Sequence, residues 1–396
     1  MEFHEGYNRI VNNDTLTPPI WVSTTMALKN LVDDLRSQDR VAVDTESNSL
    51  HAYREQVCLI QFSTPQNDYL IDSLALTDLS TLSPLFANPA IEKIFHAAEY
   101  DINCLHRDFS FSFKNLFDTV IAARILGHQV IGLGDLITVY FDVIVNKKYQ
   151  KSDWGYRPLT AEQEDYARLD SHYLIALRDI LEKELIDRGL LELAHEDFKR
   201  ACLPSNGNGK LPKARWERIS GHQDLTPRQF STLNELCNTR EEIAERLNRP
   251  VFKVVNDDLL LSLAQTVPDS TMGLEEAGLT KVQVEKFGAQ FLKAIRSGQN
   301  APLVARTRNK RPSDSMLARL DRLKQWRKKE AGKIKVESDI ILPKTLMYSI
   351  AEQGPRDMKK LGLVMKESPW RFEHYGEEII KVLESKSKTK ETPAST

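Results

Sequence analysis

The chain has 396 residues, 41% of them hydrophobic, and a formal net charge of −2. This length predicts two or three domains, and no apolar run reaches the roughly eighteen residues that a membrane-spanning helix needs. Four widely spaced cysteines without a CxxC pair exclude a disulfide framework and a zinc site, and the first residues lack a signal-peptide pattern, so we expect a cytoplasmic protein with reduced thiols.

The small net charge conceals an asymmetry between the two halves of the chain. Residues 1–200 contain 19 Lys and Arg against 31 Asp and Glu, a net charge of −12, whereas residues 201–396 contain 35 against 25, a net charge of +10. A basic half can hold an anionic polymer through phosphate contacts, and an acidic half needs cations to tolerate the same polymer. The alternative for any single charged block is an ordinary solvated surface.

Residues 20–202 show the pattern of an α/β domain, after a loose extension at residues 1–19. An amphipathic helix is expected at Thr25–Ser37. Short apolar runs predict strands at Val41–Val43, Val57–Ser63, Asp68–Ile71, Ile91–Phe95 and Leu116–Phe117. Strands that alternate with helices in this way favour a mixed sheet flanked by helices.

A long helix is expected near the end of this domain. Thr160 and Gln163 have the spacing of a capping box, and Pro158 lies just outside it. The helix is expected to run to about Asp187 and to stop at Gly189, because glycine suits the left-handed conformation that often ends a helix.

The second half of the chain is predicted to be helical and to repeat. The segment from Asn256 aligns with the segment from Pro343 at an offset of 87 residues, which places Leu259 on Leu346. Two tandem helical domains explain this repeat. The predicted boundaries are an extension 1–19, an α/β domain 20–202, a linker 203–212, a helical domain 213–298, a basic linker 299–312, a second helical domain 313–386 and a disordered tail 387–396.

Acidic residues follow the first predicted strand. Asp44 and Glu46 are two positions apart, and residues i and i+2 of a strand point to the same face of a sheet. Two carboxylates would therefore project together from the sheet. The alternative is an ordinary polar turn after a strand.

Further acidic positions occur in two later motifs. Asp101 follows a predicted strand and could instead cap a helix, a role that we expect for Asp118. Tyr166 and Asp170 lie one turn apart on the capped helix, although Tyr166 could simply pack in the core. Taken together, carboxylates set in apolar contexts indicate a hard divalent cation, which prefers oxygen ligands and shares phosphate oxygens with a substrate.

The order Asp-x-Glu, Asp and Tyr-x-x-x-Asp resembles the DEDD exonuclease superfamily in its tyrosine-bearing subclass. The segments VAVDTESNSL, KIFHAAEYDINCL and DYARLDSHYL, followed by the tandem repeats, look like bacterial ribonuclease D with two HRDC domains. The resemblance implies a ribonuclease H-like α/β domain followed by two small helical bundles. It also implies a 3′→5′ exoribonuclease that trims structured RNA precursors, chiefly tRNA, and releases nucleoside 5′-monophosphates. The alternatives are a DNA exonuclease with the same site and a binding protein with an inactive nuclease fold.

The resemblance further implies two Mg²⁺ or Mn²⁺ ions. Asp44 would bridge both ions, Glu46 and Asp170 would complete the site for the ion that activates water, and Asp101 would serve the other. Tyr166 would orient the attacking water. RNA is the implied partner, no membrane or small-molecule cofactor is expected, and the protein is expected to be a monomer.

Five more residues are candidates for substrate binding. His51 and Tyr53 follow the first acidic motif in a loop, where their rings could stack on terminal bases, although the same residues would suit an ordinary loop. His96 ends a predicted strand. The resemblance suggests that the segment containing Lys151 and Trp154 lines the site, but Trp154 could equally be an anchor of the core.

Overall fold

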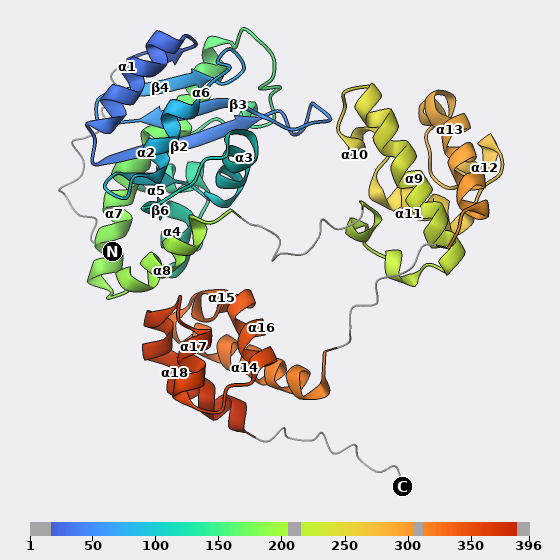
Figure 1. The fold of residues 1–396 in the computed structure, drawn as a ribbon. Helices are drawn as coiled ribbons and strands as arrows, with labels where there is room; N and C mark the ends of the chain where they lie inside the picture. The colour runs from blue at the N-terminus through green and yellow to red at the C-terminus, as the bar shows by residue number, and fades with distance from the viewer. Residues whose placement is uncertain (1–16, 205–214, 304–311, 386–396) are drawn as a thin grey trace.

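The computed structural model describes residues 17–204, 215–303 and 312–385, which form an α/β domain, a first helical bundle and a second helical bundle (Figure 1). The predicted extension, both predicted linkers and the predicted tail lie largely or wholly outside the described residues. The predicted domain boundaries therefore stay predictions.

The α/β domain is built on one six-stranded sheet in the order β1-β4-β3-β2-β5-β6. Its strands are β1 Ile20–Val22, β2 Arg40–Ser47, β3 Val57–Ser63, β4 Asp68–Asp72, β5 Glu92–Phe95 and β6 Leu116–Asp118. Strand β3 is antiparallel to β2 and β4, and the other pairs are parallel. The sheet is mixed, as predicted. The three-residue strand β1, which pairs with β4, was not predicted because so short a run has no detectable alternation.

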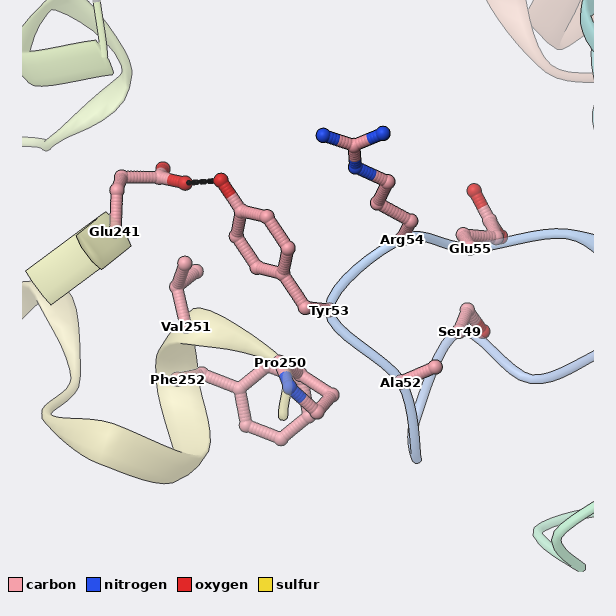
Figure 2. A pocket seen from close by; sticks show the side chains of 9 residues that line it. All are labelled: Ser49, Ala52, Tyr53, Arg54, Glu55, Glu241, Pro250, Val251 and Phe252. Atoms are coloured by element: carbon pink, nitrogen blue, oxygen red, sulfur yellow. Dashed lines mark hydrogen bonds between the residues drawn. The ribbon is translucent and has the colours of Figure 1, made fainter. Parts of the chain in front are cut away.

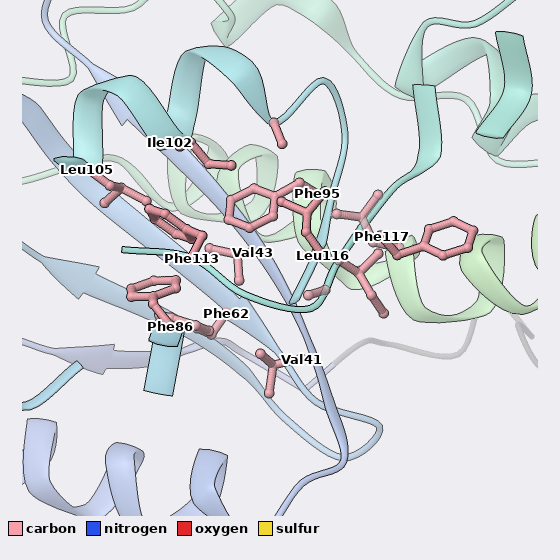
Figure 3. Close-up of a cluster of buried hydrophobic side chains, with 14 of the residues drawn as sticks. Val41, Val43, Phe62, Phe86, Phe95, Ile102, Leu105, Phe113, Leu116 and Phe117 are labelled. Atoms are coloured by element: carbon pink, nitrogen blue, oxygen red, sulfur yellow. The ribbon is translucent and has the colours of Figure 1, made fainter. Parts of the chain in front are cut away.

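Helices follow and cover these strands. The α-helices of this domain are α1 Thr25–Arg36, α2 Ser83–Ala87, α3 Glu99–Phe109, α4 Thr119–Ile125, α5 Leu133–Phe141, α6 Ala161–His172, α7 Leu174–Asp187 and α8 Leu191–Ala201, with short 3₁₀ helices at Ser80–Leu82 and Lys147–Tyr149. Figure 3 shows the larger of the two clusters of buried side chains in this domain, in which Val43 of β2 and Phe62 of β3 lie among Phe86, Phe95 and Phe113. Burial of these side chains fixes the sheet that carries the acidic residues.

The long capped helix is in fact two helices. The capping box of Thr160 and Gln163 is present, and α6 begins where the sequence predicts. The prediction of one helix to Asp187 was wrong, because α6 ends at His172 and α7 begins at Leu174. Tyr173 lies at the junction, buried against the ring of Phe141 with centroids 5.3 Å apart.

The two helical bundles confirm the repeat. The first contains 3₁₀ helices at Arg215–Arg218 and His222–Asp224 and helices α9 Pro227–Arg246, α10 Val251–Val254, α11 Asp257–Thr266, α12 Thr271–Glu276 and α13 Lys281–Asn300. The second contains α14 Asp314–Ile334, α15 Ser338–Ile341, α16 Lys344–Gln353, α17 Met358–Val364 and α18 Pro369–Glu384. Helices α14 to α17 each begin 87 residues after their counterparts in the first bundle, and α18 begins 88 residues after α13. Each bundle has its own hydrophobic core.

The second bundle is bound to the α/β domain by a buried cation. Arg371 of α18 is fully buried and donates to Asp197 at 2.7 and 3.0 Å and to Glu196 at 2.8 Å, both on α8. Ile340 of α15 joins the core of the α/β domain, and Arg124 of α4 donates to Asp339 at 2.8 Å. This interface is therefore packed and ionic.

Two expectations about the whole chain can be compared with the structure. The four cysteines are buried and unpaired, as the absence of a disulfide framework predicts. Within the described ranges, none of the helices combines the length and the apolar character that crossing a membrane requires.

Candidate active site

Two of the predicted carboxylates project from strand β2 on one face of the sheet. Asp44 and Glu46 lie opposite Gln61 and Leu59 of β3, and directly opposite residues of an antiparallel pair point to the same face. Leu59 packs in a cluster with Ala167 of α6. Both carboxylates therefore face helix α6.

Helix α6 supplies the other half of the cluster. Tyr166 and Asp170 lie one turn apart on the side of α6 that packs against β2, β3 and β4. Carboxylate oxygens of Asp44, Glu46 and Asp170 all lie within 4.8 Å of one another, and the three residues are half-buried. Residues that are more than a hundred positions apart in the sequence thus form one acidic group.

Asp101 enters from a different element. It lies in the first turn of α3, which begins shortly after β5, and only 5% of its surface is exposed. The hydroxyl of Thr45, the residue between the two β2 carboxylates, donates to Asp101 Oδ1. Asp118 caps α4, as predicted, and also accepts hydrogen bonds from the backbone of Ala98 at 2.8 Å, which anchors the start of α3.

Burial and mutual repulsion make these carboxyl groups hard to ionise. Burial, followed by the charges of Asp101, Asp170 and Glu46, raises the pKa of Asp44 well above its usual value. The pKa of Glu46 is raised for the same reasons. Burial raises the pKa of Asp101 and of Asp170 to about 7, although hydrogen bonds from Thr45 and Tyr166, respectively, oppose these shifts.

The hydroxyl of Tyr166 hydrogen-bonds to Asp170, and burial together with the nearby carboxylates raises the pKa of this phenol above its usual value. Tyr166 therefore stays protonated at neutral pH. The ring of Trp154 stacks on the ring of Tyr166 with centroids 6.0 Å apart, and Trp154 is 1% exposed. The structure thus places Trp154 in the core beside the site, which was the alternative to a direct role in substrate binding.

Arg157 holds the segment that carries Trp154, a role that no sequence pattern indicates. Its guanidinium donates to Asp72 at 2.9 Å through two nitrogens, to the carbonyl of Trp154 at 2.8 Å and to that of Cys58 at 2.7 Å. The partners come from different parts of the sheet and its loops, so only the fold reveals them. Thr45, which bonds to Asp101, is a second residue that the motif alone did not identify.

The remaining predicted residues lie around the cluster in different surroundings. His96 pairs with the hydroxyl of Thr119 at 2.9 Å, and burial lowers its pKa to about 4. His51 contacts the backbone oxygen of Lys151 at 3.0 Å, which joins the two predicted substrate-binding segments, and the side chain of Lys151 is exposed. Their roles toward a substrate stay predictions.

Tyr53 lies in a cleft between the α/β domain and the first bundle. Figure 2 shows its ring pointing from the β2–β3 loop toward the first bundle, where its hydroxyl donates to Glu241 of α9 at 2.8 Å. The cleft has a volume of about 460 Å³ and is also lined by Arg54 and Phe252. None of the five predicted catalytic residues lines it. In this arrangement Tyr53 contacts the first bundle, whereas the prediction assigned it to terminal bases.

The donor set of the acidic cluster fits divalent metal ions. Its ligand atoms are carboxylate oxygens, which Mg²⁺ and Mn²⁺ prefer, and they approach one another closely enough to share an ion. Burial and mutual repulsion disfavour the ionised form of these carboxyl groups, and a bound cation would stabilise that ionised form.

Comparisons with known proteins agree with this geometry. Residues 19–186 match the 3′-5′ exonuclease family, and residues 229–295 and 316–383 each match the HRDC domain. The exosome complex exonuclease RRP6 of Saccharomyces cerevisiae is 32% identical in an alignment 271 positions long, which covers 65% of this chain and 37% of the yeast protein. Protein RRP6-like 3 of Arabidopsis thaliana is 41% identical in an alignment 276 positions long, which covers 64% of this chain and 31% of that protein. The chain thus spans about a third of the length of these curated relatives.

Solved structures show the same fold. The catalytic core of RRP6 from Trypanosoma brucei aligns with a TM-score of 0.61 and 28% identity, over 72% of this chain and 80% of that chain. Escherichia coli RNase D aligns with a TM-score of 0.68 and 24% identity, over 93% of this chain and 99% of that chain. The expected likeness to bacterial ribonuclease D is confirmed for the fold alone, and the curated relatives named above are eukaryotic. DEDD exonucleases use divalent metal ions, in agreement with the carboxylate cluster. Residues 19–186 therefore match a 3′-5′ exonuclease domain that carries the DEDD-type set of acidic residues, and each of the two helical bundles matches the HRDC domain.

Proposed function

We propose that this protein is a metal-dependent 3′→5′ exoribonuclease of the ribonuclease D type, which trims the 3′ ends of structured RNA precursors, chiefly tRNA. The observation that carries the proposal is the convergence of Asp44, Glu46 and Asp170 within 4.8 Å, inside a 3′-5′ exonuclease domain. RNA as the substrate is supported by the relatives. Escherichia coli RNase D is described as an exoribonuclease involved in structured RNA processing, and the yeast relative as an exosome complex exonuclease.

In this proposal two divalent ions, Mg²⁺ or Mn²⁺, supply electrostatic stabilisation of the attacking and leaving oxygens of the phosphodiester. Asp44, Glu46 and Asp170 would hold one ion, and Asp44 and Asp101 the other. The protonated hydroxyl of Tyr166 donates hydrogen bonds and would orient the attacking water, and the stacked ring of Trp154 keeps that hydroxyl in place.

We further propose that the protein acts as a monomer in the cytoplasm. Its four unpaired, buried cysteines support a reducing compartment.

One experiment tests the activity and the sugar preference together. A tRNA precursor with a 3′ extension and a DNA strand of matched sequence, both labelled at the 5′ end, would be incubated with the full chain in Mg²⁺ and in chelator. We expect stepwise shortening of the RNA in Mg²⁺ only, while the DNA stays intact. Equal shortening of both strands would leave a DNA exonuclease as the alternative, and no cleavage in Mg²⁺ or, in a parallel reaction, in Mn²⁺ would contradict the proposal.

A further inference from the structure

Gln61 is a buried amide whose hydrogen-bonding groups are unsatisfied. Its exposed fraction is 0%, and neither its Oε1 nor its Nε2 has a hydrogen-bond partner within the described ranges. A buried amide normally makes hydrogen bonds, because loss of water without a replacement partner is costly. The position therefore requires an explanation beyond core packing.

In the described parts of the chain, each of the other side chains with an unsatisfied buried atom leaves a single N–H unpaired. Arg168, Arg240 and Arg327 each leave one Nε unpaired but donate through another guanidinium nitrogen. Trp154 leaves its single indole N–H unpaired. Among these side chains, Gln61 alone leaves both a donor and an acceptor unpaired.

Gln61 lies beside the acidic cluster. It is directly opposite Asp44 in the β2–β3 ladder and opposite Leu70 in the β3–β4 ladder, so the three side chains share one face of the sheet. Leu70 packs in the same cluster as Tyr166, which places this face beneath α6.

Two positions along β3, the hydroxyl of Ser63 lies 2.8 Å from the hydroxyl of Ser171, one residue beyond Asp170. The amide of Gln61 is thus enclosed between the strand that carries Asp44 and the helix that carries Asp170.

We propose that Gln61 is a positioning residue of the metal site, whose amide N–H donates to the carboxylate of Asp44 when that carboxylate holds a divalent ion. The inference rests on the metal site of the proposed function. A carboxylate that binds a metal usually needs a second hydrogen bond to fix its orientation, and such outer partners affect metal affinity strongly. An amide suits this position because it donates without a positive charge, which would compete with the ion for the carboxylate.

The test compares the metal affinity and the metal-free stability of the Gln61→Met variant of the full chain. Methionine has a similar length and no amide, so it removes the donor and preserves the volume. Calorimetric titration with Mn²⁺ alone, without RNA, should show binding about ten-fold weaker than in the wild type. In chelator, the melting temperature should equal or exceed that of the wild type, because the unsatisfied amide has been removed.

Leu59→Met is the matched control. Leu59 lies on the same face of β3, opposite Glu46, and carries no polar group, so this variant should bind Mn²⁺ like the wild type. Unchanged Mn²⁺ affinity of Gln61→Met overturns the inference, whatever its melting temperature. Weaker Mn²⁺ binding together with a clear fall of the melting temperature in chelator also overturns it, because general loosening of the fold would explain both. Absence of Mn²⁺ binding by the wild type would refute the metal site itself and thereby the proposed function.

Discussion

At the residue scale, repulsion among the carboxylates of the acidic cluster opposes their ionisation, and a bound cation would favour it. Asp101 and Asp170 have pKa values of about 7, and those of Asp44 and Glu46 are raised well above their usual values. In the metal-free protein, part of this cluster is protonated at neutral pH. Metal binding must release these protons, so metal affinity depends on pH.

The pH dependence of folding stability and that of metal affinity both follow from the upward direction of these pKa shifts. Each pKa is higher in the folded state than in the unfolded chain, so between about pH 4 and 7 the folded state binds more protons and the metal-free protein loses stability as pH rises. Mn²⁺ affinity should instead increase as pH rises through about 7, because the ion binds to the deprotonated carboxylates. Calorimetric titration at a series of pH values would measure this. An affinity independent of pH across that range would contradict the assignment of these groups as ligands.

The hydroxyl of Tyr166 provides a second prediction at this scale. Tyr166→Phe removes the hydrogen bond to Asp170 and the group that would orient water, but keeps the ring that stacks on Trp154. We expect kcat to fall by roughly 10²-fold with Mn²⁺ affinity little changed. Tyr149→Phe, which alters a ring 6.3 Å from that of Tyr166, serves as the control and should keep its activity. Equal kcat values for Tyr166→Phe and wild type would remove Tyr166 from the mechanism.

Sequence patterns singled out some of the residues that meet in this part of the structure, but not all of them. The four carboxylates and Tyr166 could be singled out because they interrupt apolar patterns at recognisable spacings. Gln61 and Arg157 could not, because their importance depends on strands and loops that meet only in the folded chain. Tyr53 shows a further limit, since its contact with the first bundle depends on how separate domains come together.

At the element scale, α8 and α18 join the exonuclease domain to the second HRDC domain. Arg371→Met would leave Glu196 and Asp197 buried without their main cation, which should lower the free energy of unfolding by about 3–5 kcal/mol. Urea unfolding of the full chain measures this loss. Lys366→Met, on an exposed side chain, should change stability by only about 0.5 kcal/mol or less. A similarly small effect for Arg371→Met would mean that the two domains are not held together by this contact.

Some boundaries of helices and strands follow from the local sequence pattern, and others do not. Strand β3 was predicted to the residue because a segment with five apolar side chains among its seven residues is followed by turn residues. The repeat was found because both bundles keep the same spacing of core positions over 87 residues. The break between α6 and α7 was missed, since the packing of Tyr173 against Phe141 overrides a continuous helical pattern.

At the scale of the whole molecule, opposite net charges are divided between the two halves of the chain. The acidic half contains the exonuclease domain, and the basic half contains both HRDC domains. A chain that ends after Leu203 should keep cleavage of short single strands but bind long structured RNA more weakly, with a shallower dependence on salt because fewer phosphate contacts are made. Affinity measured by fluorescence anisotropy at several salt concentrations checks this. An unchanged salt slope would show that the basic half does not hold the RNA.

The central claim is that the carboxylates on β2, α3 and α6 form the metal site of an exoribonuclease. The most direct measurement compares the cleavage of a 5′-labelled, 3′-extended tRNA precursor in Mg²⁺ by the wild type, Asp44→Asn and Asp39→Asn. Asp39→Asn removes a nearby exposed carboxylate and should cleave like the wild type. We predict that Asp44→Asn folds normally by circular dichroism but leaves the RNA at full length. Shortening of the RNA by Asp44→Asn at the wild-type rate would contradict the account.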